Sequence, residues 1–309
     1  MPLLGDVIVI LGATAVGKTK LALDLAEALN GEIVGADSRQ IYRYMDIGTA
    51  KPTPAQRTRV PHHLVDVATP DSTLSLAQIQ DLAYSAFDQI HQRGKLPFLV
   101  GGTGQYLTAI CEGWTIPRVP PQAELRAELE AFAQAQGAQA LHARLAQLDP
   151  EYAARTHPNN VRRVIRALEV CLTSGERMSQ QQQQRSLPYR FLKFGLTLER
   201  EELYSRADQR VQQMMAEGFL DEVRLLLQLG YERHLPAMSA VGYAELCAHL
   251  LDGIALDDAL ERICFNTHDF IRRQEVWFRK HEPATMWHNS KDIHFSTLMT
   301  HIATWRGTA

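Results

Sequence analysis

The stretch Gly12-Ala-Thr-Ala-Val-Gly17-Lys18-Thr19 decides the fold, because it matches the phosphate-binding pattern G-x-x-x-x-G-K-[ST]. It follows a short apolar run at residues 7–11 and precedes a segment whose leucines recur with helical spacing at 21, 25 and 29. In such a strand–loop–helix turn, successive backbone N–H groups converge on phosphate oxygens at the positive end of a helix. The pattern therefore predicts a diphosphate site formed by Gly12, Ala13, Thr14, Ala15, Val16, Gly17, Lys18 and Thr19.

The segments around this loop alternate as they do in α/β proteins. Apolar runs at 32–36 and 96–100 flank a segment, 73–93, with helical periodicity. Alternation of this kind predicts a parallel sheet covered by helices on both faces. The loop pattern narrows the prediction to a sheet core like that of the P-loop NTPases.

The residue pattern of the chain changes from alternating strands and helices to helices alone after Trp114. Prolines at 117, 120 and 121 break it, and residues 122–184 then read as helices with no strand candidate. A returning strand is expected at 191–198, followed by helices at 199–218, 219–229, 241–251 and 256–280. We therefore expect a catalytic core of residues 1–115 and 190–309, interrupted by a helical insertion domain at 116–189.

Overall composition says little about partners. The formal net charge of −3 gives no global signal for nucleic acid, so a polyanion would have to be held by local basic clusters. No apolar stretch is long enough to cross a bilayer, which predicts a cytoplasmic protein with no membrane partner. The four cysteines are scattered singly and predict buried, reduced thiols.

The acid that usually accompanies a phosphate-binding loop is missing from its usual place. A P-loop ATPase carries a Mg²⁺-organising acid at the end of an apolar strand, whereas the strand at 96–100 runs into Gly101 and Gly102. The only acid at a strand end is Asp37. Asp37 could organise a metal in a small-molecule kinase, or it could act as a general base across the site from the loop.

Several further blocks, in order along the chain, resemble the tRNA dimethylallyltransferases of the IPP transferase family. They are Asp37-Ser-Arg-Gln-Ile-Tyr-Arg-Tyr-Met-Asp-Ile-Gly-Thr-Ala-Lys-Pro52, His62-His-Leu-Val-Asp66, Gly101-Gly-Thr-Gly-Gln-Tyr106, Arg163-Val-Ile-Arg-Ala-Leu-Glu169, Val241-Gly-Tyr-Ala-Glu245 and Arg272-Arg-Gln-Glu-Val-Trp-Phe-Arg279. The block at 37–52 is far more specific than the glycine loop.

The resemblance implies a reaction, its cofactor and its partners. N6 of the adenine at position 37, next to the anticodon, attacks C1 of dimethylallyl diphosphate in tRNAs that read codons starting with U, which gives N6-dimethylallyladenosine. The implied catalytic residues are Asp37 as general base, and Lys18 and Thr19 at the leaving diphosphate, with Thr19 holding Mg²⁺ as cofactor. The anticodon stem-loop is the expected tRNA partner, and the base must be extruded to react.

The resemblance also implies tRNA-binding residues. Asp37, Ser38, Arg39, Gln40 and Thr103 are expected against the flipped nucleotide, although Thr103 could instead only close its turn. Helical spacing places Arg162, Arg163 and Arg166 together on one solvated face. The full set implied for the two basic helices is Arg162, Arg163, Val164, Ile165, Arg166, Arg272 and Arg273. His268 and Asp269 depart from the family pattern and lower the local positive charge.

Other functions remain open on the residues alone. The loop would also serve nucleotide or ATP binding in a phosphotransferase whose lid carries Arg162, Arg163 and Arg166. A prenyltransferase acting on free adenine nucleotides would share the loop and Asp37. A non-catalytic RNA-binding regulator could keep the loop as a nucleotide sensor. The pair His62-His63 lacks a third ligand and favours a structural or diphosphate-side role over a metal site. We expect a monomer.

Overall fold

The structure, a computed structural model, describes residues 5–181 and 184–307. The ends of the predicted core (1–4 and 308–309) and two residues of the predicted insertion (182–183) lie outside the described part. The chain divides into two compact units, which we call the core unit (Met1–Cys111 with Leu187–Ala309) and the insertion unit (Glu112–Ser186). The division expected from the sequence, at 115 and 190, lies within a few residues of these limits.

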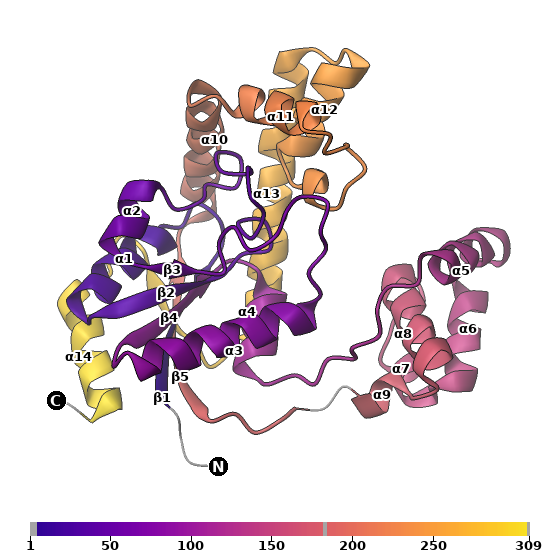
Figure 1. The fold of residues 1–309 in the computed structure, drawn as a ribbon, viewed down its shortest axis with the longest axis horizontal. Helices are drawn as coiled ribbons and strands as arrows, with labels where there is room; N and C mark the ends of the chain where they lie inside the picture. The colour runs from indigo at the N-terminus through magenta and orange to yellow at the C-terminus, as the bar shows by residue number, and fades with distance from the viewer. Residues whose placement is uncertain (1–4, 182–183, 308–309) are drawn as a thin grey trace. The chain divides into compact units, whose positions relative to one another are not determined.

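The core unit contains a parallel sheet of six strands in the order β3-β2-β4-β1-β5-β6 (Figure 1). The strands are β1 (Gly5–Gly12), β2 (Gly31–Ala36), β3 (His62–His63), β4 (Leu96–Gly101), β5 (Tyr189–Thr197) and β6 (Met286–Asn289). Every pair is parallel, so the carboxyl ends of β1, β2 and β4 meet at one edge. The predicted α/β class is confirmed. The sequence did not predict β3 and β6, which are too short to show a period.

Helices cover both faces of the sheet because β1 is apolar on both of its sides. Val7, Val9 and Leu11 pack into one buried cluster with α3 and α4, whereas Ile8 and Ile10 pack into another with α1 and α14. Successive residues of a strand point to opposite faces, so an unbroken apolar run serves both clusters. The helices of the core unit are α1 (Lys18–Ala28), α2 (Pro54–Arg59), α3 (Leu76–Gln92), α4 (Gly104–Cys111), α10 (Arg200–Ala216), α11 (Phe219–Gln228), α12 (Tyr243–Asp252), α13 (Leu256–His281) and α14 (Phe295–Arg306).

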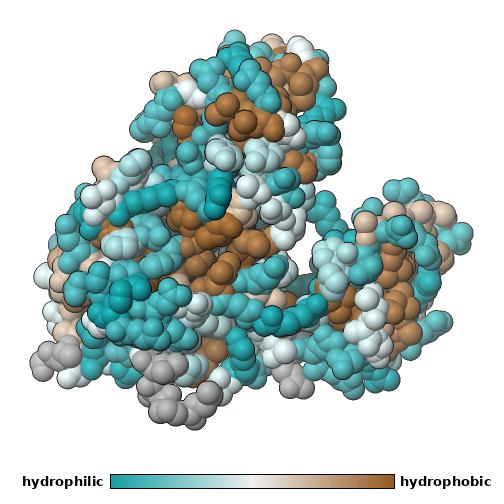
Figure 2. Space-filling model, viewed as in Figure 1, coloured by the Kyte–Doolittle hydropathy of each residue, from teal (hydrophilic) through white to brown (hydrophobic). Residues whose placement is uncertain are grey.

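Helices α11 and α12 each bury one face in the core of this unit. Their inner faces bury Phe219, Val223, Tyr243 and Leu246 in the larger core cluster. Their outer surface is also partly apolar, as the brown colour over these helices shows in Figure 2; its exposed members are Leu225, Leu229 and Leu251. In the described part of the chain, no helix is both long and apolar enough to cross a membrane. The cysteines are reduced thiols, as expected, but only Cys247 is buried; Cys111, Cys171 and Cys264 are partly exposed.

The secondary structure of the insertion unit consists of helices in its described residues, as predicted, apart from one isolated bridge. It consists of α5 (Ala123–Gln136), α6 (Ala138–Leu148), α7 (Pro150–Ala154), α8 (Val161–Ser174) and α9 (Met178–Gln181). It has a buried cluster of its own, which includes Leu129, Leu141 and Leu145. Its entry and exit are joined by an isolated antiparallel bridge between Trp114 and Gln184. The unit therefore has the hydrophobic core that a separate folding unit needs.

A buried carboxylate, Glu32, stabilises the edge of the sheet opposite the glycine loop. Glu32 is only 3% exposed and lies 2.6 Å from Arg93, 2.7 Å from His63 and 3.0 Å from Lys95. Burial opposes ionisation of this carboxyl, but the hydrogen bonds from Arg93, His63 and Lys95 outweigh it and lower its pKa to about 2. His63 therefore has a structural role, as the sequence favoured.

Replacing Glu32 by Gln should lower the free energy of unfolding at pH 7 by about 3 kcal/mol. The folded-state pKa of Glu32 lies below its ordinary value of 4.5, so the stabilisation is fully present above pH 4.5 and is lost as the pH falls toward 2. Urea unfolding of both proteins between pH 2 and 7 measures the difference. Glu261→Gln, which removes an exposed acid of α13, is the control and should change little. A difference that stays constant over this range would contradict the assignment.

Candidate active site

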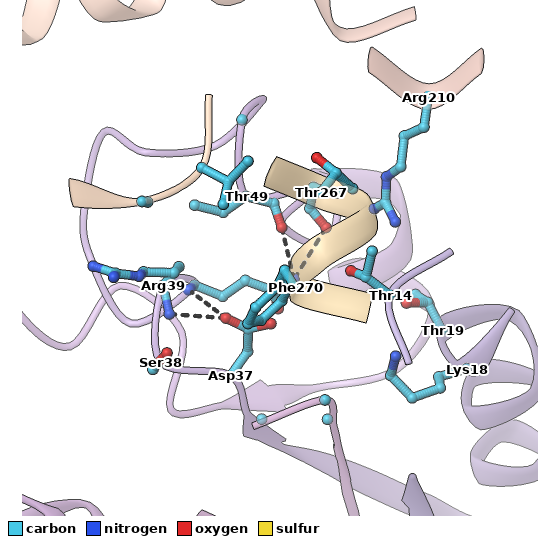
Figure 3. A pocket seen from close by; sticks show the side chains of 18 of the residues that line it. Thr14, Lys18, Thr19, Asp37, Ser38, Arg39, Thr49, Arg210, Thr267 and Phe270 are labelled. Atoms are coloured by element: carbon cyan, nitrogen blue, oxygen red, sulfur yellow. Dashed lines mark hydrogen bonds between the residues drawn. The ribbon is translucent and has the colours of Figure 1, made fainter. Parts of the chain in front are cut away.

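A cavity of about 370 Å³ opens where β1, β2 and β4 end. Carboxyl ends of parallel strands are where folds of this kind place their ligands. One wall is the glycine loop with Thr14, Lys18 and Thr19, and the facing wall is the segment that starts at Asp37 (Figure 3). Side chains from α10 and α13 complete the lining. The cavity thus joins the two parts of the chain that the sequence singled out.

The glycine loop is shaped by residues that only glycine suits. Gly17 caps α1 with φ 104°, and a Cβ on Gly12 would lie 2.5 Å from the Leu196 carbonyl oxygen. The Lys18 ammonium donates to the Ala13 carbonyl at 2.7 Å, inside the turn. Burial lowers the pKa of Lys18 to about 8, which Asp37 opposes and Arg210 assists. Lys18 therefore remains mostly charged at pH 7, and the glycine loop brings one cation to the cavity.

Asp37 follows β2, and only one of its two carboxylate oxygens accepts hydrogen bonds from the described residues. Its Oδ1 accepts from the backbone N–H of Arg39 at 2.8 Å and of Gln40 at 3.3 Å. No described residue donates a hydrogen bond to Oδ2. Figure 3 places this side chain across the cavity from Lys18 and Thr19. The arrangement suits a carboxylate that accepts a proton from a ligand lying between the two walls.

The neighbours of Asp37 are mostly occupied within the protein. The Ser38 N–H donates to the Thr103 hydroxyl at 3.0 Å, so Thr103 closes the turn, which was one of its two expected roles. The Arg39 guanidinium donates to the carbonyl of Pro236 at 2.6 Å. The carboxamide of Gln40 donates to the carbonyls of Thr49 and Ala50. Ser38, Arg39 and Gln40 line the cavity, whereas Thr103 lies behind it.

Sequence reasoning missed Arg210, which brings a second cation to the cavity. Arg210 lies on α10 and lines the cavity with Thr19 and Asp37. Burial lowers the pKa of its guanidinium, and the nearby Asp37 carboxylate opposes this. Ala207, Val211 and Met214 line the cavity from the same helix face. A single arginine at positions that otherwise recur as an apolar stripe was the signal that could have revealed it.

Gln274 was also missed, although it lies inside a quoted motif. Its Oε1 accepts from the Thr14 N–H at 2.9 Å, and its Nε2 donates to the Gly102 carbonyl at 2.8 Å. The side chain is 6% exposed. Gln274 lies on α13, which is remote in sequence from both segments. Its two hydrogen bonds therefore link the glycine loop to the turn after β4.

The two arginines predicted beside Gln274 are both paired with Asp269. Arg272 lies 2.9 Å from this carboxylate, and Arg273 is bonded to its other oxygen. Arg273 lines the cavity, whereas Arg272 does not. Asp269 was a departure from the family pattern, and it neutralises the cluster on which the tRNA assignment of these arginines rests.

The predicted RNA-binding helix in the insertion unit needs correction at three positions. Arg162 and Arg163 are exposed as expected at the start of α8. Val164 and Ile165 are buried, so their side chains cannot contact RNA. Arg166 does not join the solvated face, because its guanidinium is bonded to the fully buried Glu169 at 2.5 Å and to the Val119 carbonyl at 3.0 Å. The stretch up to Leu168 that suggested a free basic face holds no acid, but Glu169 follows it directly.

The described residues contain no group of three or more His, Cys, Asp or Glu that could hold a metal ion. His62 lines the cavity, and its Nδ1 lies 2.7 Å from the Val60 carbonyl oxygen. Thr14 and Thr19 of the glycine loop line the cavity, and a threonine hydroxyl fits Mg²⁺, which binds few protein ligands and keeps water and phosphate oxygens.

Comparison with known proteins identifies close relatives. Residues 40–281 match the IPP transferase family. A tRNA dimethylallyltransferase from Chloroflexus aggregans is 54% identical over 284 residues, which cover 92% of this chain and 96% of that protein. The crystal structure of a full-length tRNA isopentenylpyrophosphate transferase from Bacillus halodurans is similar with a TM-score of 0.70 at 41% identity, covering 98% and 95% of the two chains. A eukaryotic dimethylallyltransferase acting on tRNA has a TM-score of 0.78 at 27% identity, covering 93% and 74%.

Replacing Gln274 by Leu should weaken the binding of inorganic diphosphate by about tenfold, because the partly buried Thr14 N–H loses its acceptor and the glycine loop loses its link to the turn after β4. Titration calorimetry with inorganic diphosphate measures the effect. Gln212→Leu, at an exposed position of α10, is the matched control and should bind as the wild type does. Equal affinities in the Gln274 variant and the wild type would show that this contact does not shape the loop.

Proposed function

The chain belongs to the IPP transferase family, and we propose that it prenylates tRNA with dimethylallyl diphosphate as the donor. The enzyme is a tRNA dimethylallyltransferase in its reaction class. We propose N6 of adenine 37, 3′ to the anticodon of tRNAs that read codons starting with U, as the acceptor. One observation carries the proposal: Asp37 and the glycine loop face each other across one cavity.

The geometry divides the reaction between two walls of this cavity. The N6 lone pair forms a bond to C1 of the donor, while the C1–O bond breaks and its electron pair leaves with the diphosphate. The proton from N6 passes to the free Oδ2 of Asp37. Negative charge on the departing diphosphate is stabilised by the loop N–H groups, Lys18 and Arg210.

Magnesium fits this scheme through Thr19. The Thr19 hydroxyl lines the cavity next to Lys18 and would hold the ion, with diphosphate oxygens and water as its other ligands. When bound, the ion would add positive charge at the leaving group. This role is separate from that of Asp37, which lies on the opposite wall.

The rival functions have less support. Strand β4 ends in Gly101 and Gly102, not in an acid that would organise Mg²⁺ for phosphoryl transfer from ATP. A lid of Arg162, Arg163 and Arg166 is not favoured, because Arg166 is held by Glu169. Relatives along nearly the whole chain are tRNA enzymes, which disfavours free adenine nucleotides as acceptors. We expect a cytoplasmic monomer, since one chain carries both walls of the site.

The test of function is transfer of labelled prenyl groups. The enzyme is incubated with bulk tRNA and dimethylallyl diphosphate labelled in the prenyl group, and separately with γ-labelled ATP. We expect label in tRNA only from the prenyl donor, on an adenine next to the anticodon. Label from ATP would indicate a phosphotransferase, and label on free AMP but not on tRNA would indicate a nucleotide prenyltransferase.

Replacing Asp37 by Asn should lower kcat by about 10²- to 10⁴-fold, because the amide keeps the shape and an acceptor but cannot take the N6 proton. Affinities for tRNA and donor should stay nearly unchanged. Single-turnover rates measured against Mg²⁺ concentration provide the check. Recovery of the rate at high Mg²⁺, together with weaker donor binding, would instead identify Asp37 as a metal-organising acid.

Replacing Arg162 and Arg163 by Ala should raise the KM for tRNA and reduce the salt slope of binding by roughly one unit for each phosphate that is no longer neutralised. The KM for the donor should stay constant, because neither arginine lines the cavity. Binding measured between low and physiological salt gives the slope. Arg306→Ala, in the C-terminal helix α14, is the control. An unchanged slope in the double variant would leave both arginines as ordinary surface charges.

A further inference from the structure

One carboxylate outside the cavity holds the loop that forms part of its wall. Glu222 on α11 accepts hydrogen bonds from three consecutive backbone N–H groups, those of Asp46 (2.8 Å), Ile47 (2.7 Å) and Gly48 (3.2 Å). The Tyr243 hydroxyl donates to the same carboxylate at 2.6 Å. Four donors thus meet one side chain, an arrangement that only an ionised carboxylate satisfies.

The loop fastened by Glu222 has little room to shift. A Cβ on Gly48 would lie 2.1 Å from the ring of Phe219, so the bare backbone packs against that ring. On its other side the buried Lys51 donates to the Tyr42 carbonyl at 2.6 Å and to Asp66 at 2.7 Å. These contacts fix the loop between α11 and the sheet.

The fixed loop orients Gln40, which stands next to Asp37 in the cavity wall. The carbonyls of Thr49 and Ala50, which follow Gly48 directly, each accept from Nε2 of Gln40 at 3.1 Å. Both N–H bonds of the carboxamide are therefore used, and its Oε1 is the polar atom left for a ligand. Together with the free Oδ2 of Asp37, the wall offers two acceptors, which match the two hydrogens of an exocyclic amino group.

We propose that Glu222 is a positioning residue for the acceptor base. It acts through the 46–50 loop and Gln40. In this way it fixes the position of the part of the cavity wall that accepts hydrogen bonds from an exocyclic amino group. The inference rests on the proposed function, because it assigns this wall to adenine. The hydrogen bonds of Glu222 go to the 46–48 backbone and to Tyr243, not to the glycine loop or Arg210, so its effect is expected on the acceptor side of the reaction.

Replacing Glu222 by Gln tests the proposal, because the amide keeps the size of the side chain but turns an N–H donor toward backbone donors. We expect kcat/KM for tRNA to fall about tenfold or more, while the KM for dimethylallyl diphosphate stays within about twofold. Asp221→Asn is the matched control: it removes an equal charge from the neighbouring position, whose side chain is 78% exposed, and should leave both constants unchanged. Tyr243→Phe removes one of the four hydrogen bonds and should act in the same direction with a smaller effect.

A double-variant cycle separates positioning from a general loss of structure. If Glu222 acts through Gln40, then adding Glu222→Gln to Gln40→Ala should lower kcat/KM for tRNA no further than Gln40→Ala does alone. The proposal would be overturned if the two substitutions lowered kcat/KM for tRNA multiplicatively. It would also be overturned if Glu222→Gln lowered kcat/KM equally for donor and tRNA, or if this variant were as active as the wild type. Should Glu222→Gln fail to fold, Tyr243→Phe decides: unchanged tRNA kinetics in that variant overturns it. A wild type without prenyl transfer would overturn the proposed function, and this inference with it.

Discussion

The site depends on how closely β2 and β4 approach each other where both strands end. At Gly101 even a Cβ would lie 2.0 Å from the Ala36 carbonyl oxygen, so no other residue could hold the strands at this separation. The chain leaving β4 can then bond back to β2, through the Thr103 N–H to Ala36 and the Ser38 N–H to the Thr103 hydroxyl. Asp37 lies between these two contacts. Main-chain packing therefore sets the position of its backbone, and the hydrogen bonds to Oδ1 orient its side chain.

Around this point the protein separates the two halves of its chemistry. In the proposed reaction, the glycine loop, Lys18 and Arg210 would stabilise the negative charge of the leaving group, whereas Asp37 and Gln40 would offer acceptors to the nucleophile. The two groups come from different walls and are braced by different helices: α13 supplies Gln274 to the glycine loop, and α11 supplies Glu222 to the opposite wall. A change on one wall can therefore alter one substrate while the other is handled as before.

The parts that the sequence predicted well are those in which nearby residues carry the signal. The glycine loop, the strand ending at Asp37 and the helical insertion all follow from local patterns. Arg210 and Gln274 could not be placed this way, since tertiary packing brings them to the cavity from helices more than 150 residues beyond the loop. Arg166 failed for a related reason: periodicity assigned its face, but the buried Glu169 one turn later decided where its guanidinium went. A charged side chain on a helix can be assigned to a solvated binding face only when its ion-pair partners in the fold are known.

The bridge between Trp114 and Gln184 has a consequence for how such an enzyme could arise. It is accompanied by a bond from the Arg185 N–H to the Gly113 carbonyl at 2.8 Å, so the chain enters and leaves the insertion unit along one short antiparallel seam. Adjacent entry and exit points let a domain be spliced into a host without altering the register of any host strand. Because both ends of the insertion unit lie side by side, the unit could be gained, exchanged or enlarged without changing the pairing of the strands in the core sheet.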